Sequence, residues 1–156
     1  MAKAMKKDFI VLYARDMNIA WGDDKRYWNW IKEKDIYSNG FVDDAELIKV
    51  CYLDARKKFD TSILDPGTKY EVAFATMVKD NAEGFDHPVK LGLVIPNVIE
   101  EERKVDFSKL EKNKWLEIPV GQFIASTGKM EIYLSETSGH WKKGIIIKGI
   151  VIRAMN

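Results

Sequence analysis

The segment that decides the fold reads MEIYLSE, from Met130 to Glu136. Its apolar residues Met130, Ile132 and Leu134 alternate with residues that suit a more polar surface. A period of two residues is typical of a β-strand that packs one face on a core and turns the other toward solvent. The segment therefore predicts β-structure, and the same pattern can be sought on either side of it.

Other segments share this alternation or a high content of β-branched and aromatic residues. They are Phe9–Ala14, Tyr70–Val78, Val89–Ile95, Trp115–Val120 and Gly144–Arg153. Turn-forming sequences separate them, among them Asp65-Pro66-Gly67, Asn39-Gly40 and Ser138-Gly139. Many short strands with regular turns predict an all-β fold, an antiparallel β-sandwich of jelly-roll type with long loops.

Two segments are harder to interpret. Asp43 followed by Glu46 resembles a helix capping box, yet the apolar run from Val50 to Leu53 favours a strand, which we expect from about Leu47. The highly charged segment Glu100–Asn113 is expected to be a solvated loop with a short helical turn within it.

Length and composition narrow the class of protein. The 156 residues suit a single domain over 1–156, and the apolar fraction of 46% is enough for a core. Twenty-five basic residues nearly balance 24 acidic ones, which argues against a dedicated duplex-binding protein. The apolar run near the N-terminus is too short for a signal peptide, and no run could span a membrane, so we expect a cytoplasmic protein with no membrane partner.

Catalytic and metal-binding patterns are weak in this sequence. The single cysteine, Cys51, lies in an apolar run, where a buried core residue is the favoured interpretation. His87 and His140 lie far apart in the sequence and lack metal-ligand spacing, so neither a metal nor a cofactor is expected. Asp23 and Asp24 could form a glycosidase pair only if the fold set their separation, so we predict a protein that is not an enzyme.

Tryptophan is unusually frequent and clustered. Three of the five tryptophans fall between Trp21 and Trp30, within the sequence WGDDKRYWNW. A sugar needs such a mixture, because its apolar C–H face packs on an aromatic ring while its hydroxyls need donors and acceptors at the edge. The alternative is that Trp28 and Trp30 anchor this loop in the core, as tryptophan often does.

A second loop carries a similar combination at Ser138–Gly144, SGHWKKG. His140, Trp141 and Lys142 could form another wall of a sugar site. The alternative, equally compatible with the residues alone, is a tryptophan that begins a strand, followed by two solvated lysines.

Four blocks of the sequence resemble the phloem protein and Nictaba family of plant lectins. They are Ala14–Trp21 with Tyr27–Trp30, Ala45–Asp54, Trp115–Phe123 and His140–Arg153. The blocks occur in order over most of the chain, and they look most similar to the short phloem-sap lectins of cucurbits.

This resemblance implies a lectin that binds N-acetylglucosamine oligomers (chitooligosaccharides) and the chitobiose core of N-glycans. The two binding tryptophans of the family fall on Trp21 and Trp28, and a weaker analogy with sugar-recognising F-box proteins adds the second loop. The predicted carbohydrate site comprises Trp21, Asp23, Asp24, Trp28, His140, Trp141 and Lys142.

The resemblance also implies a location in phloem sap, and agglutination of cells would require two sites, so we expect a homodimer. The alternative function is an RNA- or protein-binding phloem transport protein. Its phosphate contacts would come from the lysine pairs Lys6-Lys7, Lys57-Lys58 and Lys142-Lys143, and the near-neutral charge predicts weak, salt-sensitive RNA binding.

Overall fold

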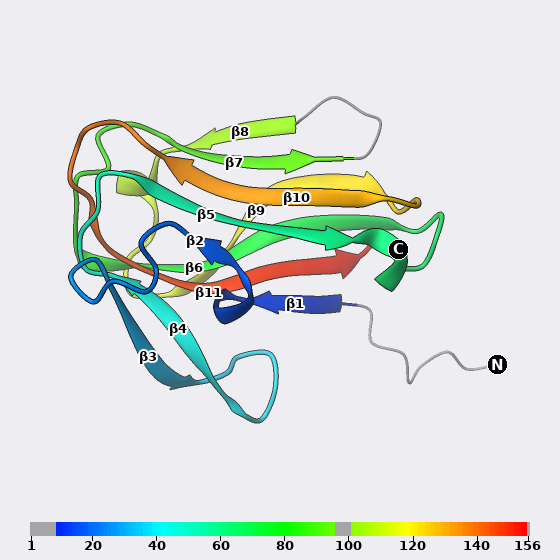
Figure 1. Ribbon diagram of the computed structural model, residues 1–156, viewed down its shortest axis with the longest axis horizontal. Helices are drawn as coiled ribbons and strands as arrows, with labels where there is room; N and C mark the ends of the chain where they lie inside the picture. The colour runs from blue at the N-terminus through cyan, green and yellow to red at the C-terminus, as the bar shows by residue number, and fades with distance from the viewer. Residues whose placement is uncertain (1–8, 96–100, 156) are drawn as a thin grey trace.

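The computed structural model describes residues 9–95 and 101–155, and they form two antiparallel β-sheets (Figure 1). The first sheet follows the order β3 (Trp28–Lys34), β4 (Phe41–Leu47), β11 (Lys143–Ala154), β6 (Lys69–Glu83) and β9 (Trp115–Ile124), and β1 (Phe9–Tyr13) also pairs with β11. The second sheet follows the order β2 (Asn18–Ile19), β5 (Leu53–Asp60), β10 (Lys129–Glu136), β7 (Val89–Val94) and β8 (Glu101–Val105). Neighbouring strands are mostly not consecutive in the chain, so crossovers connect the two sheets.

Helical structure in the described residues is limited to the 3-10 turns η1 (Ala14–Asp16), η2 (Thr61–Ile63) and η3 (Phe107–Lys109). None of the described helices has the length and apolar character that a membrane span requires.

The two sheets pack face to face around one core, so the predicted all-β antiparallel sandwich is confirmed. Met130, Ile132 and Leu134 of β10 are at most 2% exposed, as their alternation predicts. The five other predicted strands are also present, within one to five residues of their predicted ends.

The predicted strand from Leu47 is wrong, because β4 ends at Leu47 and β5 begins only at Leu53. The backbone N–H groups of Ile48 and Lys49 turn away from a strand partner and donate to the Tyr27 carbonyl, at 2.8 and 3.3 Å. Cys51 therefore lies in a linker and is partly exposed, not buried in a strand.

The expectation of a solvated loop over Glu100–Asn113 is wrong for its first part. Glu101–Val105 forms β8, which pairs with β7 at the edge of the second sheet. Its charged side chains suit an edge strand, where they discourage pairing with another chain. The helical turn that we expected in this segment is confirmed as η3.

Strand β11 lies at the centre of the first sheet and is buried on both faces. Lys148 is fully buried in it, and its Nζ lies 3.0 and 3.2 Å from the two carboxylate oxygens of Asp44 on β4. Burial and hydrogen bonding with Glu33 of β3 raise the pKa of Asp44 to about 7, against the opposing influence of the Lys148 ammonium. This cluster joins β3, β4 and β11, so its protonation state affects how firmly the β3–β4 hairpin is held.

We expect the stability of the fold to decrease between about pH 5 and pH 8 because of Asp44. A carboxyl group whose pKa is raised in the folded state stabilises the fold while it is protonated, and that contribution is lost as the pH rises toward its folded pKa. Carboxyl groups with lowered pKa, such as Asp35 and Glu136, act in the opposite direction but only at lower pH. Urea unfolding at both pH values measures the difference.

Glu33→Gln should reduce this pH dependence, because it removes the second carboxyl group beside Asp44. Glu83→Gln, at an exposed position, is the matched control and should leave the dependence unchanged. If the free energy of unfolding changed with pH equally in the wild type and in Glu33→Gln, the role assigned to the Asp44–Glu33 pair would be contradicted.

Candidate functional site

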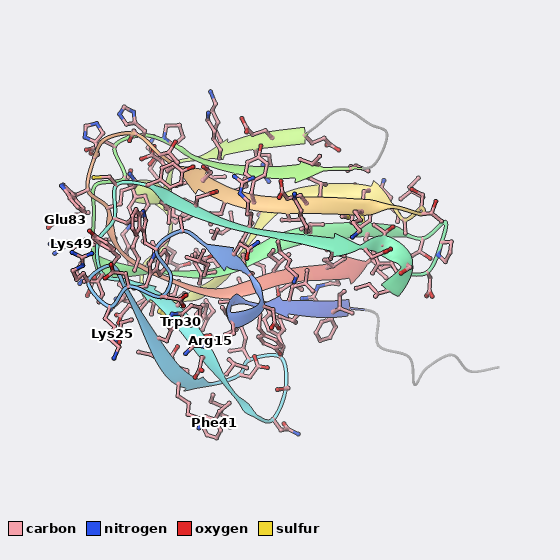
Figure 2. The ribbon with its side chains drawn as sticks, viewed as in Figure 1. Arg15, Lys25, Trp30, Phe41, Lys49 and Glu83 are labelled. Atoms are coloured by element: carbon pink, nitrogen blue, oxygen red, sulfur yellow. The ribbon has the colours of Figure 1, made fainter. Side chains whose placement is uncertain are left out.

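Two tryptophans with largely exposed side chains, Trp21 and Trp141, each 57% exposed, lie on loops at one end of the sandwich. The Trp21 ring meets Tyr27 edge-on at 5.8 Å, and the Lys49 Nζ lies 5.5 Å from the centre of the Trp141 ring. The Tyr27 carbonyl accepts the Lys49 N–H, which connects the two pairs. We call Trp21, Tyr27, Lys49 and Trp141 the aromatic rim; Figure 2 labels Lys49 at this end.

Trp21 has an unusual backbone conformation, with φ of 64°. This left-handed region is uncommon for a bulky residue and costs about 1–3 kcal/mol, so the surroundings must hold it. The indole N–H of Trp28 donates to the Ala20 carbonyl at 3.1 Å, and that of Trp30 donates to the Gly22 carbonyl at 2.8 Å. Two tryptophans of β3 thus fix the residues on either side of Trp21 and leave its ring in solvent.

Gly22 is required at this turn for a steric reason. A Cβ atom at this position would lie 2.9 Å from the Ile19 carbonyl oxygen, which is too close for any side chain. The Gly22 N–H donates to that same carbonyl at 2.9 Å and closes the turn that presents Trp21.

The two aspartates after Gly22 differ in their surroundings. Asp24 accepts hydrogen bonds from the side chain and backbone of Arg26, which lower the Asp24 pKa to about 2. Asp23 is exposed and lines three adjoining hollows of about 360, 480 and 520 Å³. Asp23 is therefore the more accessible hydrogen-bond acceptor beside Trp21.

These hollows extend from the rim toward β3. Lys25 lines two of them, and Trp30 also lines two. The Arg15 guanidinium stacks over the Trp30 ring, 4.0 Å from the ring centre (Figure 2). The Arg15 Nε also pairs with Asp43 at 3.1 Å, which fixes this stacked arrangement.

The second loop is built around a buried cation. Lys142 is 0% exposed, and its Nζ donates to the carbonyls of Cys51 and His140, each at 2.7 Å, and pairs with Glu136 at 3.0 Å. Burial opposes ionisation of Glu136, but hydrogen bonds from Ser138 and Lys142 keep its pKa below the ordinary value. The Lys142 ammonium therefore holds the loop backbone that presents His140 and Trp141.

The structure separates the seven predicted site residues into two groups. One group lies at the loop end and is accessible. Its exposed members are Trp21, Asp23, His140 and Trp141, and its fifth member, Asp24, is half-buried and paired with Arg26. The other group, Trp28 and Lys142, is not exposed as we expected. Trp28 is 1% exposed because it packs in the core, and Lys142 is enclosed by three backbone carbonyls that accept hydrogen bonds from its Nζ. Both support exposed neighbours, and their own side chains are almost wholly enclosed, although Trp28 lines part of the hollow of about 520 Å³.

Sequence reasoning did not place Tyr27, Lys49, Arg15 or Trp30 in this region as contact residues. Tyr27 and Trp30 could have been included from their position in the aromatic cluster. Lys49 could not, because only the fold brings the linker after β4 beside Trp141.

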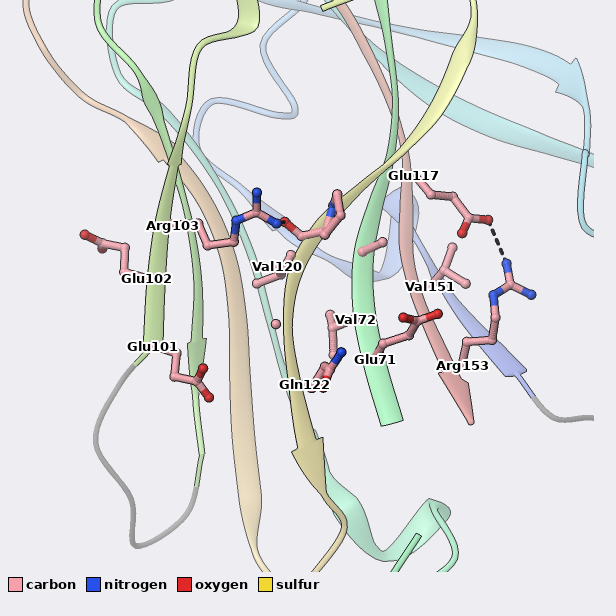
Figure 3. A pocket seen from close by; sticks show the side chains of 13 residues that line it. Glu71, Val72, Glu101, Glu102, Arg103, Glu117, Val120, Gln122, Val151 and Arg153 are labelled. Atoms are coloured by element: carbon pink, nitrogen blue, oxygen red, sulfur yellow. Dashed lines mark hydrogen bonds and ion pairs between the residues drawn. The ribbon is translucent and has the colours of Figure 1, made fainter. Parts of the chain in front are cut away.

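A further hollow of about 430 Å³ lies between β8 and β9 (Figure 3). Three of its polar side chains are engaged with one another or with the backbone: Glu117 pairs with Arg153 at 2.7 Å, and Arg103 donates to the Pro119 carbonyl at 3.0 Å. No aromatic ring lines it, so it lacks the platform found at the rim.

These observations define a class, a β-sandwich with exposed aromatic side chains at one loop end. Its fold is similar to two solved structures with carbohydrate-binding modules. The Podospora anserina GH26-CBM35 β-(1,4)-mannanase matches with a TM-score of 0.53 at 10% identity, over 97% of this chain and 28% of that one. TmCBM61 in complex with β-1,4-galactotriose matches with a TM-score of 0.50 at 16% identity, over 89% and 87%.

The chain belongs to the phloem protein 2 family, whose model matches residues 7–154. It is 41% identical to Protein PHLOEM PROTEIN 2-LIKE A1 of Arabidopsis thaliana over 92% of this chain and 60% of that protein. It is 35% identical to a lectin of Luffa acutangula over 97% of this chain and 73% of that protein. The chain thus spans less than two thirds of the Arabidopsis relative.

Removing the buried cation should destabilise the second loop. Breaking a buried ion pair from one side costs about 3–5 kcal/mol, because the remaining charge loses its partner. We expect Lys142→Ala to lower the free energy of unfolding by about this amount in urea titrations, since Glu136 would be left unpaired.

Lys143→Ala is the matched control, because Lys143 is the next residue of the chain, begins β11 and is only half-buried. Its effect should stay within about 0.5–1 kcal/mol, as for an ordinary surface position. Similar decreases in the free energy of unfolding of the two variants would argue against a structural role specific to Lys142.

Proposed function

We propose that this protein is a non-catalytic lectin that binds N-acetylglucosamine oligomers and the chitobiose core of N-glycans at the aromatic rim. The observation that carries the proposal is the exposure of Trp21, held in a left-handed turn by hydrogen bonds from the buried Trp28 and the half-buried Trp30. Membership of the phloem protein 2 family and the similarity to a Luffa lectin support it.

The chemistry of the rim suits such a sugar. The rings of Trp21 and Trp141 offer flat apolar faces for the C–H groups or the acetyl methyl group. Asp23 can accept hydrogen bonds from hydroxyl groups, and Lys25 and His140 can supply donors around them. Because the tryptophans are rigid, little conformational entropy is lost when a sugar binds.

The affinity should be modest, because the rim is open and shallow. A dissociation constant from millimolar to micromolar corresponds to about 4–8 kcal/mol. Agglutination of cells would require two such sites, and a homodimer would supply them through avidity. The proposed location is phloem sap, in defence or in glycoprotein recognition.

The proposal includes the absence of glycoside hydrolysis at this site. A glycosidase needs one carboxyl group with a raised pKa as its general acid. Arg26 has the opposite effect on Asp24, whose pKa it lowers to about 2, so Asp24 is ionised at neutral pH.

Trp21→Ala should weaken binding of chitotriose about tenfold or more, because exposed aromatic contacts contribute a large share of binding energy at such surfaces. Isothermal titration calorimetry measures the change. Phe41→Ala is the matched control, since Phe41 is an equally accessible aromatic residue (66% exposed) at the end of the β3–β4 hairpin (Figure 2). Unchanged affinity in a folded Trp21→Ala variant would exclude Trp21 from the site.

RNA binding is the second candidate function. Of the three lysine pairs expected to contact phosphate, Lys142-Lys143 is a poor candidate, because Lys142 is buried. The pair Lys6-Lys7 lies outside the described residues. We expect any RNA complex to disappear in gel-shift assays at physiological salt, because few phosphate contacts remain. A complex that survives this salt while chitotriose fails to bind would favour RNA over sugar.

A further inference from the structure

His87 and His140 come together in the fold although they are distant in the sequence. Their ring centres are 4.8 Å apart and their planes are tilted by 41°. His87 lies on the loop between β6 and β7, and His140 lies on the loop between β10 and β11, directly before Trp141. Both side chains are exposed, so solutes can reach the pair. Sequence spacing gave no indication of this arrangement.

The backbones that carry the two histidines are held in place. The first loop packs so closely on the second that a Cβ atom at Gly84 would lie 1.8 Å from the Trp141 carbonyl oxygen. The His140 carbonyl accepts a hydrogen bond from the buried Lys142 Nζ at 2.7 Å. The packing of the two loops therefore places the backbones of His87 and His140 close enough for their rings to meet.

The distance between the rings suits two ligands of one metal ion. A metal–nitrogen bond is about 2.0–2.1 Å long, and a nitrogen lies about 1.2 Å from the centre of its imidazole ring. Two neighbouring imidazole ligands of one ion therefore have ring centres roughly 4.5–5.2 Å apart. The observed 4.8 Å lies within this range. The charge of the nearby Lys142 is balanced by Glu136 at 3.0 Å, so it opposes a cation only weakly.

We propose that His87 and His140 form an open site for a divalent transition-metal ion such as Zn²⁺, a class of ion that prefers imidazole ligands. Among residues 9–95 and 101–155, no group of three or more His, Cys, Asp or Glu side chains is arranged to hold a metal. Water or another exchangeable ligand must therefore complete the coordination. The ion would join the two loops next to Trp141, so it would stabilise one wall of the aromatic rim.

Calorimetric titration of the full chain with zinc chloride, in a buffer that does not bind metals, tests this site. We expect binding of one ion per chain in the wild type. His87→Gln and His140→Gln should each weaken it by about tenfold or more, because even loss of a group that only orients a ligand costs 10–100-fold in metal affinity. Cys51→Ser is the control, since the Cys51 thiol contacts the Gly139 carbonyl in the same loop at 3.6 Å.

Thermal unfolding supplies a second readout that is independent of sugar binding. Zn²⁺ should raise the melting temperature of the wild type and of Cys51→Ser, because a ligand that binds only the folded state stabilises it. At the same zinc concentration the rise should be clearly smaller in both histidine variants, because they bind the ion more weakly. Equal zinc affinity in the wild type and the histidine variants, or loss of binding only in Cys51→Ser, would overturn the proposal. Absence of zinc binding in the wild type would also overturn it.

Discussion

The burial of β11 on both faces is the constraint on which the arrangement of the first sheet depends. Its backbone pairs with β6 along one side and with β4 and then β1 along the other. A lysine at the centre of such a strand needs a hydrogen-bond acceptor, because a buried ammonium without partners is very costly. Asp44 supplies that acceptor, and the Lys148–Asp44 pair fixes β4 against β11 next to the point where the pairing of these two strands ends. The position of the β3–β4 hairpin follows from this contact.

The aromatic rim depends on the position of this hairpin, because β3 pairs with β4 from Trp28 to Lys34 and carries the tryptophans that hold the Trp21 turn. Trp28 and Trp30 each have two roles that only a tryptophan combines. Their ring surfaces pack on the core, and their indole N–H groups donate to the carbonyls of Ala20 and Gly22. The exposed Trp21 therefore depends on buried residues for its conformation, and strain in its backbone is offset by hydrogen bonds made elsewhere.

Sequence patterns were reliable where alternate residues of a strand pack on the core, as Met130, Ile132 and Leu134 do, because alternation reports that packing directly. They failed at β8 and in the linker after Leu47. An edge strand carries charges along its length, and hydrogen bonds to the Tyr27 carbonyl cannot be seen in residue periodicity. The residue types of the candidate site were found from the sequence, but their exposure was not. Trp21 and Trp28 are chemically alike, and only the backbone conformation turns one outward and the other into the core.

The lysines illustrate why composition alone overstates the surface charge available to a ligand. Lys142 and Lys148 are both fully buried, and each pairs with an acidic side chain inside the protein. Lys142 serves as a hydrogen-bond donor to loop carbonyls, so its charge organises the binding end without contributing to its outer potential. A surface organised in this way recognises a neutral ligand through ring faces and directed hydrogen bonds better than it attracts a polyanion, whose affinity comes largely from released counterions. The placement of these cations therefore favours a sugar over a nucleic acid at the aromatic rim.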